Sequence, residues 1–262
     1  MRLVLLGTGS ADGVPNPWCE CETCADQRPR GRRSPTSVLV DGTLLLDCGP
    51  EAPGNATRFG QTLARVRAVV IGHAHHDHLD PAFLLHRSWV SEQPLQVLGP
   101  APVITAVRDW LAPGQTAVRL RELTAGDVVD LDGHRLTALA ANHEAFGEAL
   151  VYLVEDGSRR LLYATDTGLL PSATLAALRG VALDALLLEE TFGTRTDLGQ
   201  DHLDLTRFAA TLAALREAGT VHAGTQVVAV HLSHHNPPLA ELAEELARHG
   251  ASVHPDGAEL EV

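Results

Sequence analysis

The chain contains no lysine, and all 20 of its basic residues are arginines, against 33 aspartates and glutamates. The resulting formal net charge of −13 argues against long nucleic acid as a partner, because neutralising a phosphate backbone requires a basic surface. A small phosphate ester is still compatible with this charge, since bound cations would reverse the local potential.

Long apolar runs are also absent. No stretch approaches the roughly 20 apolar residues that a membrane-spanning helix needs. The opening MRLVLLGTGS is too short and too rich in glycine for a signal peptide, and is typical of a first strand that enters a turn. We therefore expect a cytoplasmic protein with no membrane partner.

Cysteine is scarce, with four residues in the chain. In a cytoplasmic protein these favour metal binding or burial over disulfide bonds. Three of them, Cys19, Cys21 and Cys24, lie in the stretch CECETC, whose spacing suits one tetrahedral ion better than disulfide bridges. We expect the fourth, Cys48, to be a packed free thiol.

The organisation along the chain predicts an α/β protein with one domain over residues 1–262, because no repeat, low-complexity tract or linker interrupts it. Its motifs lie on loops after strands, as in two sheets packed beneath outer helices. Apolar patterns predict strands at 2–6, 36–40, 43–47, 66–72, 95–98, 128–131, 134–140, 149–155, 160–165, 185–189 and 226–231. Helices are predicted at 81–89, 101–110, 172–178, 205–217 and 238–248, with short strands closing the chain.

The densest motif is GHAHHDHLD, directly after an expected buried strand. If the chain stays extended there, the side chains of His73, His75 and Asp77 share one side and His76 points the other way. His78 has the wrong parity and joins them only if the backbone turns. Imidazoles together with a carboxylate suit Zn²⁺, Mn²⁺ or Fe²⁺.

Further candidate ligands follow other expected strands. His143 comes after LAAN, Asp166 after RLLYAT, and both His231 and His234 lie in HLSHHN after QVVAV. One histidine or aspartate of this kind is usually a capping or surface residue. Their shared position at the exit of an apolar strand favours one convergent site.

Together these motifs resemble those of the metallo-β-lactamase superfamily. The pattern HxHxDH is followed by a distant histidine, then an aspartate, then another histidine. The opening GTGSADGVP, the CxCxxC motif and the late HLSHH make the chain similar to the PhnP-type branch, the 5-phosphoribosyl 1,2-cyclic phosphate phosphodiesterases. The resemblance covers essentially the whole chain and implies an αββα four-layer sandwich.

The resemblance also implies a role for each matching residue. One metal ion would be held by His73, His75 and His143, a second by Asp77, His78 and His231, and Asp166 would bridge both. A structural zinc, in an N-terminal loop at about 15–35, would be held by Cys19, Cys21, Cys24 and His234.

Two supporting residues follow from the same resemblance. Asp47, in LLLDCGP, would support the ligand histidines through hydrogen bonds. His202, in GQDHLDL, would contact a phosphate or act as general acid, and Asp77 could also assist proton transfer.

The expected activity is therefore hydrolysis of a small, cyclic sugar or nucleotide phosphodiester by a hydroxide that bridges two divalent ions, zinc or manganese. Three alternatives stay open: hydrolysis of a lactone or thioester, processing of tRNA 3′ ends, and a non-hydrolytic role like that of PqqB. The family also makes a homodimer an expectation.

Overall fold

The chain folds as two seven-stranded sheets, in a computed structural model that describes residues 1–111, 116–143 and 147–262. The first sheet has the order β14-β1-β2-β3-β4-β5-β6, and its strands run parallel from β3 to β6. Its strands are β1 (Arg2–Gly7), β2 (Ser37–Val40), β3 (Leu44–Leu46), β4 (Ala68–Val70), β5 (Leu95–Gly99), β6 (Val118–Glu122) and β14 (Glu259–Glu261).

The second sheet has the order β13-β12-β11-β10-β9-β8-β7 and is parallel from β10 to β13. Its strands are β7 (Val128–Leu131), β8 (His134–Ala140), β9 (Leu150–Glu155), β10 (Arg160–Ala164), β11 (Ala185–Glu189), β12 (Gln226–Val230) and β13 (Ala251–Val253). Strands β8, β10, β11 and β12 share one direction, so their carboxyl ends lie at one edge of this sheet.

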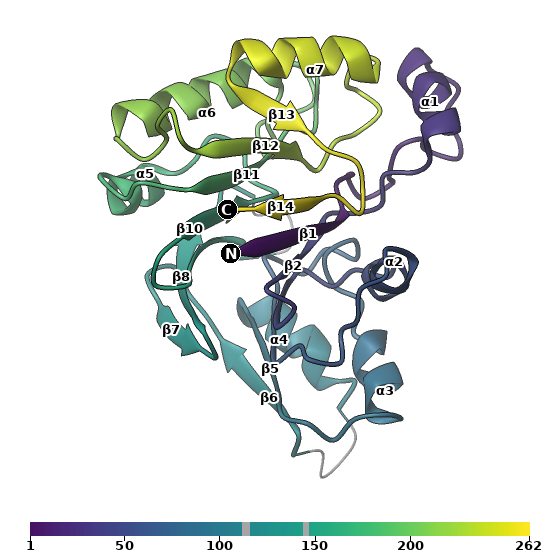
Figure 1. Ribbon diagram of the computed structural model, residues 1–262, viewed down its shortest axis with the longest axis vertical. Helices are drawn as coiled ribbons and strands as arrows, with labels where there is room; N and C mark the ends of the chain where they lie inside the picture. Colours follow the sequence, from purple (N-terminus) through teal and green to yellow (C-terminus); the bar gives the residue numbers. More distant parts are fainter. Residues whose placement is uncertain (112–115, 144–146) are drawn as a thin grey trace.

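Helices cover the outer face of each sheet (Figure 1). The helices are α1 (Glu22–Gln27), α2 (Ala52–Arg58), α3 (Ala82–Ser88), α4 (Ala101–Arg108), α5 (Ser172–Leu178), α6 (Leu205–Glu217) and α7 (Leu239–Arg248), with a 3₁₀ turn at Arg28–Arg30. Side chains alternate across the sheets: Leu44 and Leu46 enter the core between them, whereas Leu45 packs outward with α2, α3 and α4. Helices α5, α6 and α7 bury a third cluster on the other outer face. The result is the αββα four-layer sandwich that the sequence predicts.

The expected elements are present, several with the predicted bounds and the others with ends shifted by one or two residues. Strand β6 and helices α1 and α2 were not among the elements predicted from the sequence. Helices α1 and α2 are short, at six and seven residues, and α2 contains the weak helix formers Pro53 and Gly54. No helix in the described part of the chain is long and apolar enough to cross a membrane.

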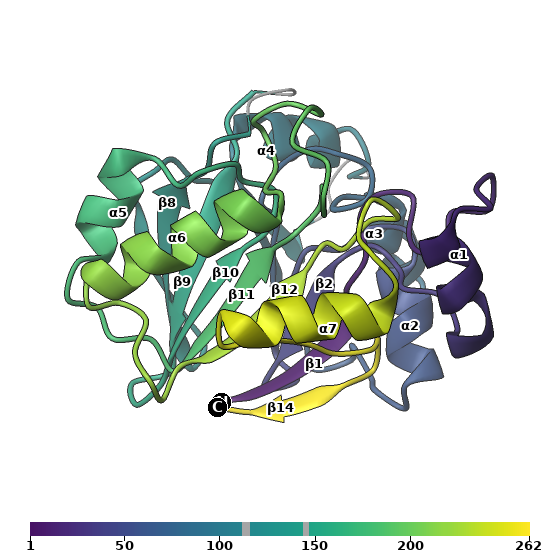
Figure 2. The ribbon, with the colours of Figure 1, turned by 90° about the horizontal axis from the view of Figure 1, so that it is seen from above.

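The two sheets are joined where the site lies. The backbone N–H of Leu150 on β9 donates to the carbonyl of Gly72, which follows β4, at 2.9 Å. The Tyr152 hydroxyl donates to the carbonyl of Ile71 at 2.8 Å. At the opposite end, the N- and C-termini lie side by side (Figure 2), with the Met1 amine 3.3 Å from the carbonyl of Val262.

Candidate metal centre

Four ligand atoms from three loops converge on one point beyond the strand ends. The Nε2 of His73 lies 2.7 Å from the Nδ1 of His75, which lies 3.2 Å from the Nε2 of His143. The Oδ2 of Asp166 is 3.6 Å from the first of these nitrogens and 3.9 Å from the last. All four atoms lie within 4.8 Å of one another, which is close enough to share one ion.

A second group lies on the other side of Asp166. The Nε2 of His78 is 3.0 Å from the Oδ2 of Asp77 and 3.0 Å from the Oδ1 of Asp166. The Nε2 of His231 is 3.3 Å and 3.2 Å from the same two oxygens. Asp166 thus presents one carboxylate oxygen to each group, the arrangement of a bridging ligand.

The chain turns within the histidine motif instead of staying extended. The carbonyl of His75 accepts the N–H groups of His78 and Leu79 at 3.1 and 3.0 Å. Asp77 therefore lies with His78 and not with His73 and His75, where alternation alone would place it. His76 is exposed.

A glycine makes room for this turn. A Cβ on Gly49 would lie 1.9 Å from the carbonyl oxygen of Asp77. The backbone after β3 can therefore approach the motif closely only without a side chain at this position.

The protonation of these groups suits divalent cations. Burial lowers the pKa of His73 and of His75, which favours their neutral imidazoles. Burial alone would raise the pKa of Asp166 and of Asp77, but the neighbouring imidazoles outweigh it and hold both well below the usual range. Ligands of both kinds must be deprotonated to bind metal.

His78 carries the opposite signature. Burial opposes its protonation, but the carboxylates of Asp166, Asp77 and Asp47 raise its pKa well above the usual value. Its Nε2 is buried and makes no hydrogen bond to a described residue, although two carboxylate oxygens lie 3.0 Å away. A buried imidazole nitrogen that faces two carboxylate oxygens without hydrogen-bonding to them is placed as a metal ligand would be. The residues therefore fit divalent metal ions.

Asp47 orients His78 from behind. Its Oδ2 accepts hydrogen bonds from the Nδ1 of His78 at 2.7 Å and from the Tyr163 hydroxyl at 2.8 Å. Its Oδ1 accepts a hydrogen bond from the N–H of Gly72 at 2.9 Å. The carboxylate is fully buried. It joins β3 of one sheet to β10 of the other beneath the candidate ligands.

His202 stands beside both groups and is held by a buried glutamate. Its Nδ1 lies 3.1 Å from each carboxylate oxygen of Glu189, while its Nε2 is 4.0 Å from the Oδ2 of Asp166. Burial alone would lower its pKa, but Glu189 and then Asp166 raise it to about 9. The Thr191 hydroxyl donates a hydrogen bond to the Oε2 of Glu189 at 2.5 Å and lies 2.9 Å from the Nδ1 of His231.

Backbone strain gathers at these positions. Among the described residues, four that are not glycine have positive φ, and three of them are Asp47 (57°), Asp166 (51°) and His231 (57°). Such conformations are unfavourable for residues with a Cβ, and they persist only where the surrounding contacts hold the backbone in place. Each residue follows the end of a strand and turns its side chain into the site.

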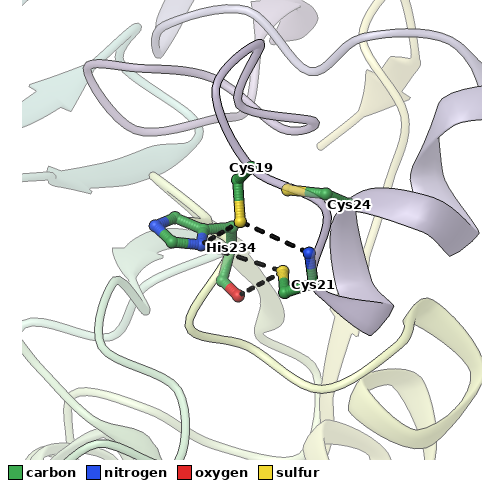
Figure 3. A group of neighbouring side chains, drawn as sticks. All are labelled: Cys19, Cys21, Cys24 and His234. Carbon is green, nitrogen blue, oxygen red and sulfur yellow. Dashed lines mark hydrogen bonds between the residues drawn. The ribbon is translucent and has the colours of Figure 1, made fainter.

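The cysteines form a separate group (Figure 3). Cys19, Cys21 and Cys24 gather with His234, whose Nδ1 is 3.4 Å and 3.8 Å from the sulfurs of the first two. Burial raises the pKa of the Cys24 thiol to about 12, whereas hydrogen bonds from Cys21 lower that of Cys19. Three sulfurs and one imidazole are the donor set of a structural zinc site. Cys48 is buried in the outer cluster of the first sheet.

Residues 43–253 match the family described as "Beta-lactamase superfamily domain". The chain belongs to this superfamily. The match covers β3 to β13 and thus both candidate ligand groups, whereas the three cysteines lie before it.

Three curated proteins show the range of its relatives. An octanoyltransferase of Porphyromonas gingivalis is 31% identical over 42% of this chain, and the chain spans only 23% of that protein. Ribonuclease Z of Mycolicibacterium paratuberculosis is 27% identical, and the match covers 94% of this chain and 89% of that protein. Coenzyme PQQ synthesis protein B of Cupriavidus necator is 25% identical over 98% of each.

Solved structures give the same range. Zn²⁺-bound PqqB from Methylobacterium extorquens has a TM-score of 0.78 at 22% identity, covering all of both chains. A diphosphatase from the PhnP family has a TM-score of 0.76 at 25% identity, covering 100% of this chain and 97% of that one. The metallo-hydrolase fold is therefore shown, and no single branch is singled out.

Three residues of the site escaped the sequence analysis. Glu189 ends an apolar strand, so the strand-end rule that found Asp166 could also have found it. Thr191 follows it by two residues. Tyr163 carries no signal in the sequence, because a tyrosine in a buried strand is an ordinary core residue.

Proposed function

We propose that the protein is a dinuclear metal-dependent phosphodiesterase acting on a small, cyclic sugar or nucleotide phosphodiester. The observation that carries this proposal is Asp166, whose two carboxylate oxygens face two different groups of ligand atoms. One group comprises His73, His75 and His143, and the other comprises Asp77, His78 and His231. Divalent ions, zinc or manganese, bound there would supply hydroxide near neutral pH and positive charge opposite the phosphate.

His202 is the residue we assign to the leaving group. Glu189 holds its Nδ1, so that its Nε2 faces the bridging carboxylate, and neutralises the charge of its protonated ring. A histidine so placed can donate a proton to the departing alkoxide or hydrogen-bond a phosphate oxygen. Asp77 is foremost a ligand, with proton transfer as a second role.

The cysteine group supports a structural role for a third ion. Zinc bound by Cys19, Cys21, Cys24 and His234 would fasten the N-terminal loop to the loop after β12, which also carries His231. A structural ion would thus keep one ligand of the catalytic centre in place.

The charge of the chain supports a small substrate. A net charge of −13 disfavours long nucleic acid, which needs a basic binding surface. We place the protein in the cytoplasm, without a membrane partner, and expect it to act as a homodimer.

Hydrolysis of bis(p-nitrophenyl) phosphate tests the proposal. The protein is supplied with Mn²⁺, Zn²⁺ or Ni²⁺, and bound metal is measured in parallel by mass spectrometry. We expect Asp166→Asn and His143→Ala to lower both turnover and metal content. His76→Ala is the matched control, because His76 lies in the same loop but is exposed. Unchanged turnover in the Asp166 and His143 variants would refute the dinuclear mechanism.

A second panel separates the alternatives. Cyclic and linear phosphodiesters, a lactone and a thioester are compared under the same conditions, and tRNA is tested for electrophoretic retardation at physiological salt. A preference for the lactone or thioester, or electrophoretic retardation of tRNA, would mean that the same site acts on a substrate other than a small phosphodiester. Full metal content without hydrolysis of any of them would favour a PqqB-like role.

A further inference from the structure

A cavity of about 1040 Å³ lies on the outer face of the first sheet. Its floor is made by the apolar side chains of Leu45, Val69 and Leu95, which point away from the core between the sheets. Its walls come from α2, from α3 and from the segment that follows each helix. The volume is at the upper end of the range for pockets that enclose small molecules.

One wall of this cavity is polar and contains an arginine. Arg87, in the last turn of α3, is partly buried there and hydrogen-bonds the carbonyl of Gln93 at 2.5 Å. Among the described residues, no carboxylate lies within the 4.0 Å ion-pair distance of its guanidinium. Glu92 is the one acidic side chain of the lining and is exposed.

The guanidinium of Arg87 is not neutralised by any carboxylate in the described part of the chain. The chain carries 33 acidic residues against 20 arginines, and none of the acidic residues that the structure describes pairs with Arg87. Burial, and then repulsion by Arg67, lower its pKa. A half-buried cation without a counter-ion beside an apolar cavity is stabilised when an anion binds.

We propose that this cavity binds an amphipathic carboxylate of fatty-acid size, with its chain on the apolar floor and its carboxylate on Arg87. The rim supports the same ligand class. Val90 lines the cavity and is 85% exposed, and the adjacent Trp89 is 69% exposed. An exposed apolar side chain at the mouth, with one cation within, matches a ligand whose charge is at one end.

The cavity is separate from the metal centre and touches its support. Cys48 lines it, and the backbone N–H of Cys48 donates to the carbonyl of His78 at 2.8 Å. The preceding residue, Asp47, holds the imidazole of the same histidine. A bound ligand would therefore contact the segment that positions His78.

Calorimetry of the full chain with dodecanoate, below its micelle concentration, tests the proposal. Dodecanol and dodecyltrimethylammonium serve as neutral and cationic probes of the same chain length. We expect one dodecanoate per chain, and binding about tenfold weaker for dodecanol, because a hydrogen bond to a charged group is lost.

Three variants and one control test where the ligand binds. Arg87→Met should weaken dodecanoate about tenfold and leave dodecanol unchanged, whereas Arg108→Met, at an exposed position on α4, should change neither. Ala64→Trp should narrow the cavity, and Val90→Asp should place a carboxylate at its mouth. Both positions are exposed, so these variants should fold, and each should weaken dodecanoate.

Three results would overturn the proposal. The first is binding of dodecanol or of the cation as tight as that of dodecanoate. The second is undiminished binding to Ala64→Trp together with loss of binding to Asp166→Asn, which would place the carboxylate at the metal centre. The third is a dimer in sedimentation experiments whose formation excludes dodecanoate, which would assign this face to a second copy.

Discussion

Replacing Asp47 by asparagine should weaken metal binding, although Asp47 is not one of the proposed ligands. The carboxylate accepts hydrogen bonds from His78 and from Tyr163 through one oxygen, at 2.7 and 2.8 Å. In Asp47→Asn an amide oriented to keep the Gly72 bond presents an NH₂ to both donors. Asparagine tolerates the positive φ of 57°, so the backbone is not strained by the change.

The magnitude follows from these contacts. Two buried hydrogen bonds, both to the Asp47 carboxylate, are lost, at about 3 kcal/mol of unfolding free energy in the metal-free protein. Metal affinity should fall by about 10- to 100-fold, because His78 loses the partner that orients it. Tyr163→Phe removes only one of the two bonds and should cost about 1 kcal/mol, with a smaller loss of affinity.

Tyr152→Phe is the matched control. Its hydroxyl is equally buried and donates at 2.8 Å, but to the carbonyl of Ile71 and not to a residue that supports a ligand. It should lower stability in urea unfolding by a similar amount to Tyr163→Phe and leave zinc affinity, measured by competition with a chelating dye, unchanged. Equal zinc affinity in Asp47→Asn and the wild type would refute the role assigned to Asp47.

Three further predictions concern other parts of the site. Glu189→Gln should slow hydrolysis by about 10²- to 10⁴-fold for diesters with poor leaving groups and less for p-nitrophenyl esters, because it removes the charge that holds His202 protonated. Cys24→Ser should remove one zinc per chain, measured by mass spectrometry, and lower the melting temperature. Gly49→Ala should lower the unfolding free energy by about 1–3 kcal/mol, because its Cβ would meet the carbonyl of Asp77 at 1.9 Å.

Each of these has a result that contradicts it. An equal loss for both kinds of leaving group in Glu189→Gln would show that His202 binds the phosphate instead of protonating the alkoxide. Full zinc content in Cys24→Ser would leave this cysteine outside the structural site. For Gly49, wild-type stability and zinc affinity in the alanine variant would mean that the two loops can separate without cost.

The sequence by itself determined the layers of the fold and most of the ligand candidates. Strand and helix periodicities are local, so elements such as β8, β11 and α6 are predicted with their observed bounds. Polar residues at the ends of apolar strands can be found in the same way, because the carboxyl ends of parallel strands meet at one edge. This rule reached His143, Asp166 and His231 without reference to a family.

Strand alternation alone would group these residues wrongly; the family resemblance implies the grouping, and the tertiary structure gives its physical reason. The turn at His75 moves Asp77 to the side of His78, and the two oxygens of Asp166 face different groups because two sheets meet there. The support of Asp47 by Tyr163 joins residues 116 positions apart, a contact that no local pattern encodes. The cavity behind β3 and β4 was equally invisible, since the shape left between helices and a sheet depends on their packing and not on any one segment.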